Sequence, residues 1–181
     1  MRPIYPIVAA TLLGAVIAGS NDGTNRPLVE VQTAAAADQI RPITLEEMIA
    51  DSEKIFAGAC TKIEEIKKDP KAGVNVVEYT FNVTKGIKGV MGCETKFKQY
   101  TGIVKNLVPR YEKGQTYILF LSPPSPNSGL TAPVGLQQGC LHVYKKDGKE
   151  LVLHEGKEIE SGQFINTVKD ILDKLNKQKK K

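Results

Sequence analysis

The chain has 181 residues, of which 41% are apolar and 25% are charged, and its net charge is +5 at pH 7. This length allows one domain with a sizeable core plus a leader. Five lysines lie between residues 174 and 181 and equal the net charge, which excludes a strongly basic nucleic-acid groove in the rest of the chain. We expect residues 177–181 to form a solvated basic tail, with a weak contact to anionic lipid or a polyanion as the alternative.

The first 20 residues have the pattern of a secretory signal peptide. Arg2 precedes an apolar run at residues 7–18, which is shorter than the roughly 18 residues of a membrane-spanning helix. Residues 18–20 offer a small-residue cleavage site, and residues 35–37 offer a second one. We therefore expect a signal peptide at residues 1–20, export to the periplasm or the extracellular space, and no stable membrane insertion of the mature chain. An uncleaved anchor is the alternative.

Residues 21–42 are small, polar and rich in alanine, so they predict a flexible linker or spacer. A folded domain is expected at residues 43–176. At its start, Thr44 and Glu47 have the spacing of a capping box, which predicts a short helix that ends near Ser52.

Four stretches then predict antiparallel strands. The first begins at Ile55 and continues, more exposed, to Ile66. At residues 77–84 apolar and polar side chains alternate, which is typical of a strand with one buried face. Residues 95–100 predict a more polar strand near a sheet edge. Residues 117–121 are the most apolar run of the mature chain and predict a strand that is buried on both faces.

The last third of the chain predicts a hairpin and a helix. Asp147-Gly148 lies between two apolar runs, which is a strong hairpin signal, and His154 is expected at the surface. At residues 164–175 apolar side chains recur with the spacing of a helix of about three turns, which we expect to pack on the strands rather than lie on a membrane. The whole pattern predicts a mainly β fold: an antiparallel five- or six-stranded OB-like barrel with a short N-terminal helix and a packed C-terminal amphipathic helix.

The three cysteines allow at most one disulfide. Cys60 lies in an apolar run and is expected in the core, whereas Cys93 and Cys140 are a candidate pair that spacing alone does not establish. Cys140 and His142 are two residues apart on a predicted strand and so share a face, but a closed zinc site needs about four ligands. No metal and no cofactor are therefore expected.

The sequence has no nucleophile elbow, no phosphate-binding loop and no zinc-protease motif, so we do not expect an enzyme. An enzyme whose site carries no motif is an alternative, with Arg110, Tyr111, Gln138 and His142 as candidate residues. The aromatic residues lie in patterns typical of core positions rather than of base-stacking surfaces, so nucleic acid is not an expected partner.

Several segments resemble a family of exported bacterial proteins without an assigned activity. The resemblance covers residues 44–175, and it is sharpest at Pro109-Arg110-Tyr111, Leu119-Phe120-Leu121 and residues 131–139. More distantly, the order of strands is similar to the netrin-like OB barrels of tissue-metalloproteinase inhibitors. In those inhibitors an N-terminal Cys of the mature chain chelates the protease zinc. The candidate mature termini here, Asn21 and Asp38, are not Cys, so this resemblance implies only a barrel.

We expect an exported, non-catalytic binding module for a protein partner. The barrel mouth or the proline-rich loop at residues 122–133 would form the site, since loops on a rigid scaffold often carry function. The prolines could equally serve only to end an aggregation-prone strand. The candidate contact residues are Arg110, Tyr111, Ser122, Pro123, Pro124, Gln137 and Gln138. The alternative is a self-assembling envelope or extracellular subunit in which Val29-Glu30-Val31 pairs with a neighbour's sheet edge.

Overall fold

The computed structural model describes residues 41–69, 74–101 and 108–178. The predicted signal peptide, nearly all of the predicted linker, Val29-Glu30-Val31 and residues 179–181 lie outside the described residues, and what we expect of them stays a prediction. In the described parts of the chain, no helix combines the length and apolarity needed to cross a bilayer.

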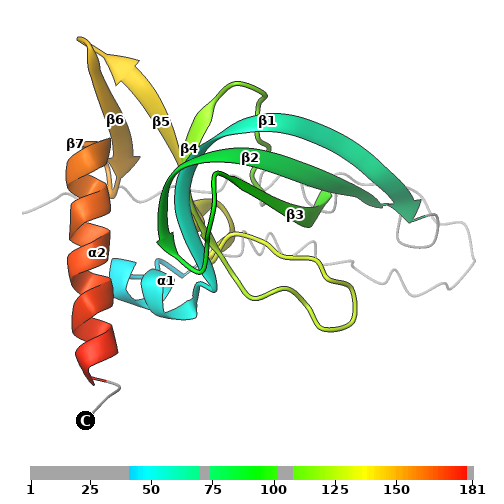
Figure 1. The fold of residues 1–181 in the computed structure, drawn as a ribbon, viewed down its shortest axis with the longest axis horizontal. Helices are drawn as coiled ribbons and strands as arrows, with labels where there is room; N and C mark the ends of the chain where they lie inside the picture. The colour runs from blue at the N-terminus through cyan, green and yellow to red at the C-terminus, as the bar shows by residue number, and fades with distance from the viewer. Residues whose placement is uncertain (1–40, 70–73, 102–107, 179–181) are drawn as a thin grey trace, which may run out of the picture. The chain divides into compact units, whose positions relative to one another are not determined.

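Seven strands form one antiparallel sheet with the order β3-β2-β1-β4-β5-β6-β7 (Figure 1). Their bounds are Lys54–Asp69 for β1, Val74–Lys88 for β2, Glu94–Thr101 for β3, Thr116–Leu121 for β4, Cys140–Lys146 for β5, Lys149–His154 for β6 and Lys157–Glu160 for β7. A short 3-10 helix, η1, covers Leu136–Gly139. Two α-helices, α1 (Leu45–Asp51) and α2 (Ser161–Gln178), lie on the same face of the sheet.

The sheet is open, so the predicted barrel of five or six strands is wrong. Closure of a barrel requires its outermost strands to pair, and the two edge strands described here, β3 and β7, do not pair with each other. β7 has only four residues and leads directly into α2, so the chain becomes helical where a closing strand would be needed. The prediction of a mainly β, antiparallel fold with a C-terminal helix is confirmed.

β4 lies at the centre of the fold and is buried on both faces, as its apolar run predicts. Its side chains alternate between two cores. Ile118 and Phe120 face the core under the helices, whereas Tyr117, Leu119 and Leu121 face the opposite one. All five are at least nine-tenths buried. A strand of this kind needs apolar residues at every position, which explains the absence of alternation in its sequence.

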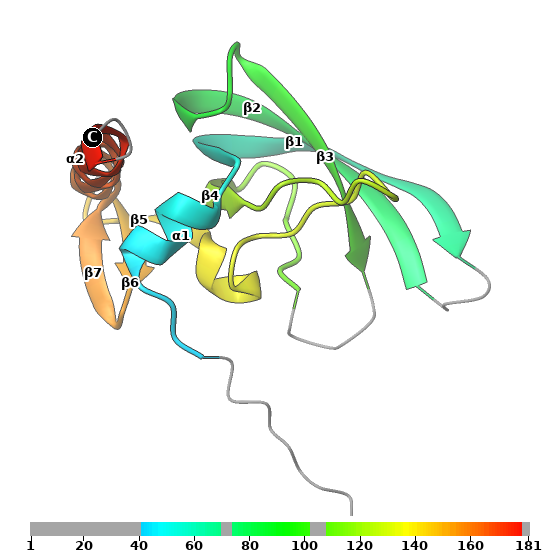
Figure 2. The same ribbon diagram turned by 90° about the horizontal axis from the view of Figure 1, so that it is seen from below.

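We call the first of these the helix-side core. Thr44 caps α1: its hydroxyl accepts a hydrogen bond from the Glu47 amide at 3.2 Å, and the Glu47 carboxylate accepts one from the Thr44 amide at 2.9 Å. α2 packs on β6 and β7, and the two helices contact each other (Figure 2). The buried residues of the helix-side core are Met48, Ile49, Ile55, Ala57, Ile118, Phe120, Val134, Leu141, Val143, Val152, Phe164, Ile165 and Val168.

The second is the aromatic core, on the other face of β4. Its buried residues are Phe56, Cys60, Val77, Tyr79, Phe81, Val83, Phe97, Tyr111, Tyr117, Leu119 and Leu121. Phe81 is fully buried at its centre, with ring centroids 5.6 Å from Phe56 and 5.3 Å from Tyr111. No helix contributes to this core in the described residues; Tyr111, from the irregular segment before β4, closes it instead.

β1 and β2 are long and bent (Figure 1). The register of their pairing shifts at four places, one of them between Cys60 and Lys62. Because an extra residue in one strand bends it and increases its twist, these irregularities explain the curvature. β4 pairs with β1 only between Lys54 and Ala59, so the second half of β1 extends beyond it.

Two tight turns shape the end of the sheet. Asp147 and Gly148 both have positive φ, 52° and 76°, so the predicted hairpin between β5 and β6 is confirmed. Glu155 and Gly156 repeat the same geometry at 51° and 76° and add β7, which the sequence did not predict. His154 precedes this turn and its ring packs 5.1 Å from that of Phe164, so the expectation of a surface position is wrong.

Candidate functional site

The loop after β4 is fixed by its own hydrogen bonds. The Ser122 amide donates to the Ala132 carbonyl at 3.0 Å, and the Thr131 hydroxyl donates to the Ser122 carbonyl at 2.5 Å. Farther out, the Ser125 amide donates to the Leu130 carbonyl at 2.8 Å. A loop whose ends and middle are all bonded loses little conformational entropy when it binds something.

The same loop is attached to the sheet. The Thr131 amide donates to the Lys98 carbonyl on β3 at 2.9 Å, and Lys98 forms a parallel bridge with Leu130. The loop therefore covers part of the outer edge of β3, which would otherwise expose unpaired backbone groups. This attachment places the proline-rich segment beside the aromatic core.

Between the loop and β3 lies an open cavity of about 460 Å³, which we call the loop cavity. Its apolar lining comes from Val108, Pro123, Leu130 and Ala132, and its polar lining comes from Gln99, Tyr100 and the hydroxyls of the loop. No charged side chain of the described residues lines it. Of the predicted contact residues, Ser122 and Pro123 line this cavity, whereas Pro124 is exposed outside it.

Arg110 and Tyr111 lie at a different cavity of about 510 Å³, which we call the Arg110 cavity. Tyr111 is only 4% exposed and its ring centroid lies 4.6 Å from that of Tyr79. Burial raises the pKa of the Tyr111 hydroxyl well above its ordinary range. Tyr111 is therefore mainly a core residue that closes the aromatic core, and Arg110 is the exposed member of the pair.

Gln99 separates the two cavities, and it was not among the residues predicted from the sequence. Gln99 is 1% exposed. Its side-chain carboxamide donates a hydrogen bond to the Pro109 carbonyl at 3.1 Å and accepts one from the Tyr111 hydroxyl at 3.4 Å. These bonds hold the irregular segment against β3. The sequence did contain one sign that Gln99 is buried. It lies two positions after Phe97 in β3, so the two side chains point to the same face of the strand.

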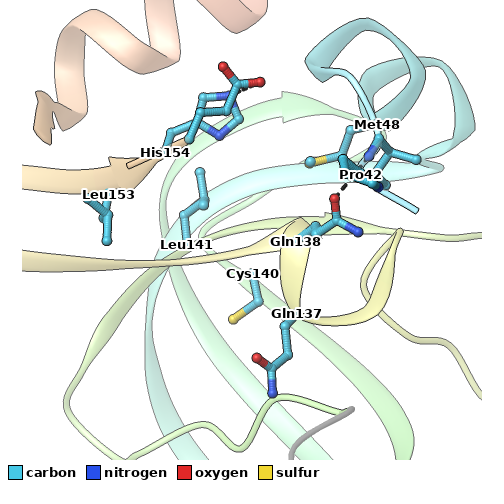
Figure 3. Close-up of a pocket in the computed structure, with 10 residues that line it drawn as sticks. Pro42, Met48, Gln137, Gln138, Cys140, Leu141, Leu153 and His154 are labelled. Atoms are coloured by element: carbon cyan, nitrogen blue, oxygen red, sulfur yellow. Dashed lines mark hydrogen bonds and ion pairs between the residues drawn. The ribbon is translucent and has the colours of Figure 1, made fainter. Parts of the chain in front are cut away.

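Gln137 and Gln138 lie at a third cavity, of about 440 Å³, beside η1 (Figure 3). The Gln138 carboxamide accepts a hydrogen bond from the Ile43 amide at 3.0 Å and donates one to the Arg41 carbonyl at 3.2 Å. In Figure 3 this side chain reaches toward Pro42, and Gln137 points the other way. Gln138 thus fixes the chain that enters α1, a structural contact rather than a free surface group.

The cysteines are three free thiols in the structure. Cys60 is buried in the aromatic core, as expected, and burial raises the pKa of its thiol. Cys140 is half-buried at the start of β5, and burial raises the pKa of its thiol to about 12. A nucleophilic cysteine needs the opposite shift. Cys93 is exposed in the turn before β3, and its pairing with Cys140 stays a prediction.

His142 lies on the exposed face of β5, where its Nε2 is 3.1 Å from the Gln115 Oε1. Its ring centroid lies 5.3 Å from that of Tyr117, and Cys140, two positions earlier on the strand, also packs against the aromatic core. In the part of the chain that the structure describes, no group of three or more His, Cys, Asp or Glu side chains is placed to hold a metal ion. The four residues considered for catalysis do not meet: Arg110 and Tyr111 share one cavity, Gln138 lines another, and His142 lines neither.

No protein-family model matches the chain, and no curated protein is significantly similar to it.

Proposed function

We propose that the chain is an exported, non-catalytic binding module that receives an uncharged, mainly apolar part of a protein partner in the loop cavity. The observation that carries this proposal is the loop at residues 122–132, which hydrogen bonds to itself and to β3 around an open cavity with an apolar lining. Export rests on the sequence of residues 1–20, and N-terminal sequencing of the protein from culture fluid or periplasm tests it.

The lining determines what fits. Val108, Pro123, Leu130 and Ala132 offer apolar surface, and the surrounding hydroxyls offer neutral hydrogen-bonding groups. This combination is typical of sites that bury an apolar group and orient it with a few polar contacts. A charged ligand would lose hydration without gaining a counter-ion, which costs several kcal/mol by order of magnitude. An uncharged partner segment is therefore favoured.

The test compares two leucines. Leu130 is half-buried and lines the loop cavity, whereas Leu153 is 56% exposed on β6 and does not. The chain and its variants are immobilised and exposed to the producing cell's envelope and culture fluid. We expect wild type and Leu153→Asp to retain the same partner in stoichiometric amounts and Leu130→Asp to lose it at an unchanged melting temperature. Equal retention by both variants would contradict the proposal.

Self-association through β1 is a second candidate, because the half of β1 beyond β4 carries two exposed apolar residues. Ile63 is 42% exposed and Ile66 is 47% exposed. The bulges and the lysines along β1 oppose edge pairing, which makes this candidate the weaker one. Sedimentation equilibrium tests it: a mass that rises with concentration and returns to that of a monomer in Ile66→Lys would support it, and a monomer throughout would exclude it.

A further inference from the structure

The Arg110 cavity differs from the loop cavity because charged groups line it. Its buried lining consists of Val77, Tyr79 and Tyr111, all from the aromatic core. Its exposed lining includes Arg110, from the irregular segment before β4, and Glu65, from β1. Among the described residues, its lining thus combines the small accessible parts of these core side chains with one cation and one anion.

These two charges do not neutralise each other. Neither Arg110 nor Glu65 makes an ion pair or a side-chain hydrogen bond with the described residues, although several other surface charges do, such as Lys62 with Glu64 at 2.7 Å and Lys146 with Glu158 at 2.8 Å. The Arg110 guanidinium nevertheless acts on the cavity lining. Burial raises the pKa of the Tyr79 hydroxyl, the Cys60 thiol adds to the shift, and Arg110 works against it.

Two further polar groups complete the lining, on the paired strands β2 and β3. Thr101 lies opposite Asn75, and its hydroxyl donates to the Asn75 carbonyl at 3.3 Å. This bond fixes the ends of the two strands. The Asn75 carboxamide itself has no hydrogen-bond partner among the described residues, so it is available to a ligand.

We propose that the Arg110 cavity is a second binding site, for a free amino acid with an apolar or aromatic side chain. The ligand's carboxylate would pair with Arg110, its ammonium group with Glu65, and its side chain would lie against Tyr79 and Tyr111. Arginine suits this role because its planar fork matches a carboxylate with two parallel hydrogen bonds. Aromatic rings pack favourably edge to face, the geometry that Tyr79 and Tyr111 already adopt with each other.

The size of the cavity supports a small ligand. Its volume of about 510 Å³ lies within the range of small-molecule sites, roughly 300–1,000 Å³. The Gln99 and Tyr111 side chains stand between it and the loop cavity, so the two sites can be tested separately.

The experiment is an NMR titration of the ¹⁵N-labelled full chain with three probes. L-phenylalanine carries both charges, N-acetyl-L-phenylalanine lacks the cation, and L-phenylalaninamide lacks the anion. We expect L-phenylalanine to shift the amide signals of Asn75, Thr101 and Arg110 saturably. Because partly exposed ion pairs are worth up to about 1 kcal/mol, its Kd should be about threefold to fivefold lower than that of either analogue.

Variants test which charged group of the ligand pairs with which residue of the cavity. Arg110→Gln should abolish the preference for L-phenylalanine over its amide, and Glu65→Gln should abolish the preference over the N-acetyl form. Lys113→Gln, an exposed cation outside the cavity, is the matched control and should change nothing. Arg110→Lys keeps the charge without the fork and should give an intermediate preference. Leu130→Asp should leave L-phenylalanine binding intact, which separates this site from the loop cavity.

Three results would overturn the proposal. They are equal affinity of the wild-type chain for all three probes, shifts that do not saturate, and preferences that survive Arg110→Gln in a chain with an unchanged melting temperature.

Discussion

The helix-side core and the aromatic core lie on opposite faces of the same central strand, but they are closed in different ways. α1 and α2 cover the first with regular backbone, and their apolar stripes supply Met48, Ile49 and Phe164. The second is closed by Tyr111 from an irregular segment, with the loop at residues 122–132 attached beside it. Both cavities to which we assign ligands lie on this second side.

The two covers differ in how their backbone N–H and C=O groups are hydrogen bonded. A helix satisfies most of its own N–H and C=O groups, whereas an irregular segment needs side chains to do so. Here the Gln99 side-chain carboxamide donates a hydrogen bond to the Pro109 carbonyl, and the Tyr117 hydroxyl accepts one from the Glu112 backbone N–H at 3.0 Å. Such a cover leaves polar side chains and open spaces at the surface, and these are the features that a binding site needs.

The largest effect is expected from Phe81→Ala, which removes the central ring of the aromatic core. Truncation of a fully buried phenylalanine costs about 3–5 kcal/mol of unfolding free energy. Phe164→Ala in the helix-side core is the matched control, with a similar loss in urea denaturation. Only Phe81→Ala should weaken the near-ultraviolet circular dichroism of the packed tyrosines at native conditions. Equal spectral loss in both variants would show that the two cores are not independent.

Gly135→Ala tests the contact that fixes the chain entering α1. Gly135 has φ 62° and a Cβ there would overlap the Ile43 side chain, so backbone strain and a steric conflict combine to cost about 1–3 kcal/mol. Gly148→Ala has φ 76° but open space around the new methyl, so it should cost less. Thermal unfolding compares them, and a smaller loss for Gly135→Ala would contradict the packing described.

Tyr111→Phe tests the hydrogen bond that holds the irregular cover. It leaves the buried Gln99 Oε1 without its donor, which we expect to cost about 1–2 kcal/mol. Tyr144→Phe is the control, because the Tyr144 hydroxyl bonds the exposed Glu158 carboxylate and its loss should stay within about 0.5 kcal/mol. Urea denaturation measures both. Equal losses would mean that the Gln99–Tyr111 contact contributes nothing beyond a surface bond.

The effect of Cys140 is the smallest at neutral pH and appears only at alkaline pH. The Cys140 thiol has a pKa raised from 9.0 to about 12, so between these values the unfolded chain releases a proton that the folded chain keeps. The free energy of unfolding therefore falls as the pH rises through this window. Cys140→Ala should reduce that slope, whereas Cys93→Ala, at an exposed thiol, should not. The same slope in Cys140→Ala and wild type would refute this assignment.

Local structure could be predicted from this sequence where one pattern decides it. The run at residues 117–121, the Asp147-Gly148 turn and the apolar stripe of α2 each led to the element that is present. β7 was missed because its turn places Glu155, rather than the Asn or Asp of a usual hairpin signal, at positive φ. Whether the sheet closes into a barrel could not be predicted, because closure depends on pairing between strands that are far apart in the sequence.

The sequence allowed the candidate residues to be named, but not their positions relative to one another. Arg110, Ser122 and Gln138 look equally polar in the sequence, yet the structure assigns them to three cavities. The Tyr111 hydroxyl is hydrogen bonded to Gln99 inside the protein. The Gln138 carboxamide is hydrogen bonded to the backbone of Arg41 and Ile43. Such partners lie up to 97 positions away in the chain, and no spacing rule reaches that far.

An amide shift map of the ¹⁵N-labelled chain, titrated with N-acetyl-L-leucinamide, tests whether the loop-covered side of the sheet binds ligands. This probe is neutral and carries one apolar side chain. We expect saturable shifts at Tyr100, Ser125 and Leu130, around the loop cavity, and their loss in Leu130→Asp. Shifts centred on Leu153 and His154 beside the helix-side core, or no saturable shift at all, would show that the loop cavity does not bind such a group.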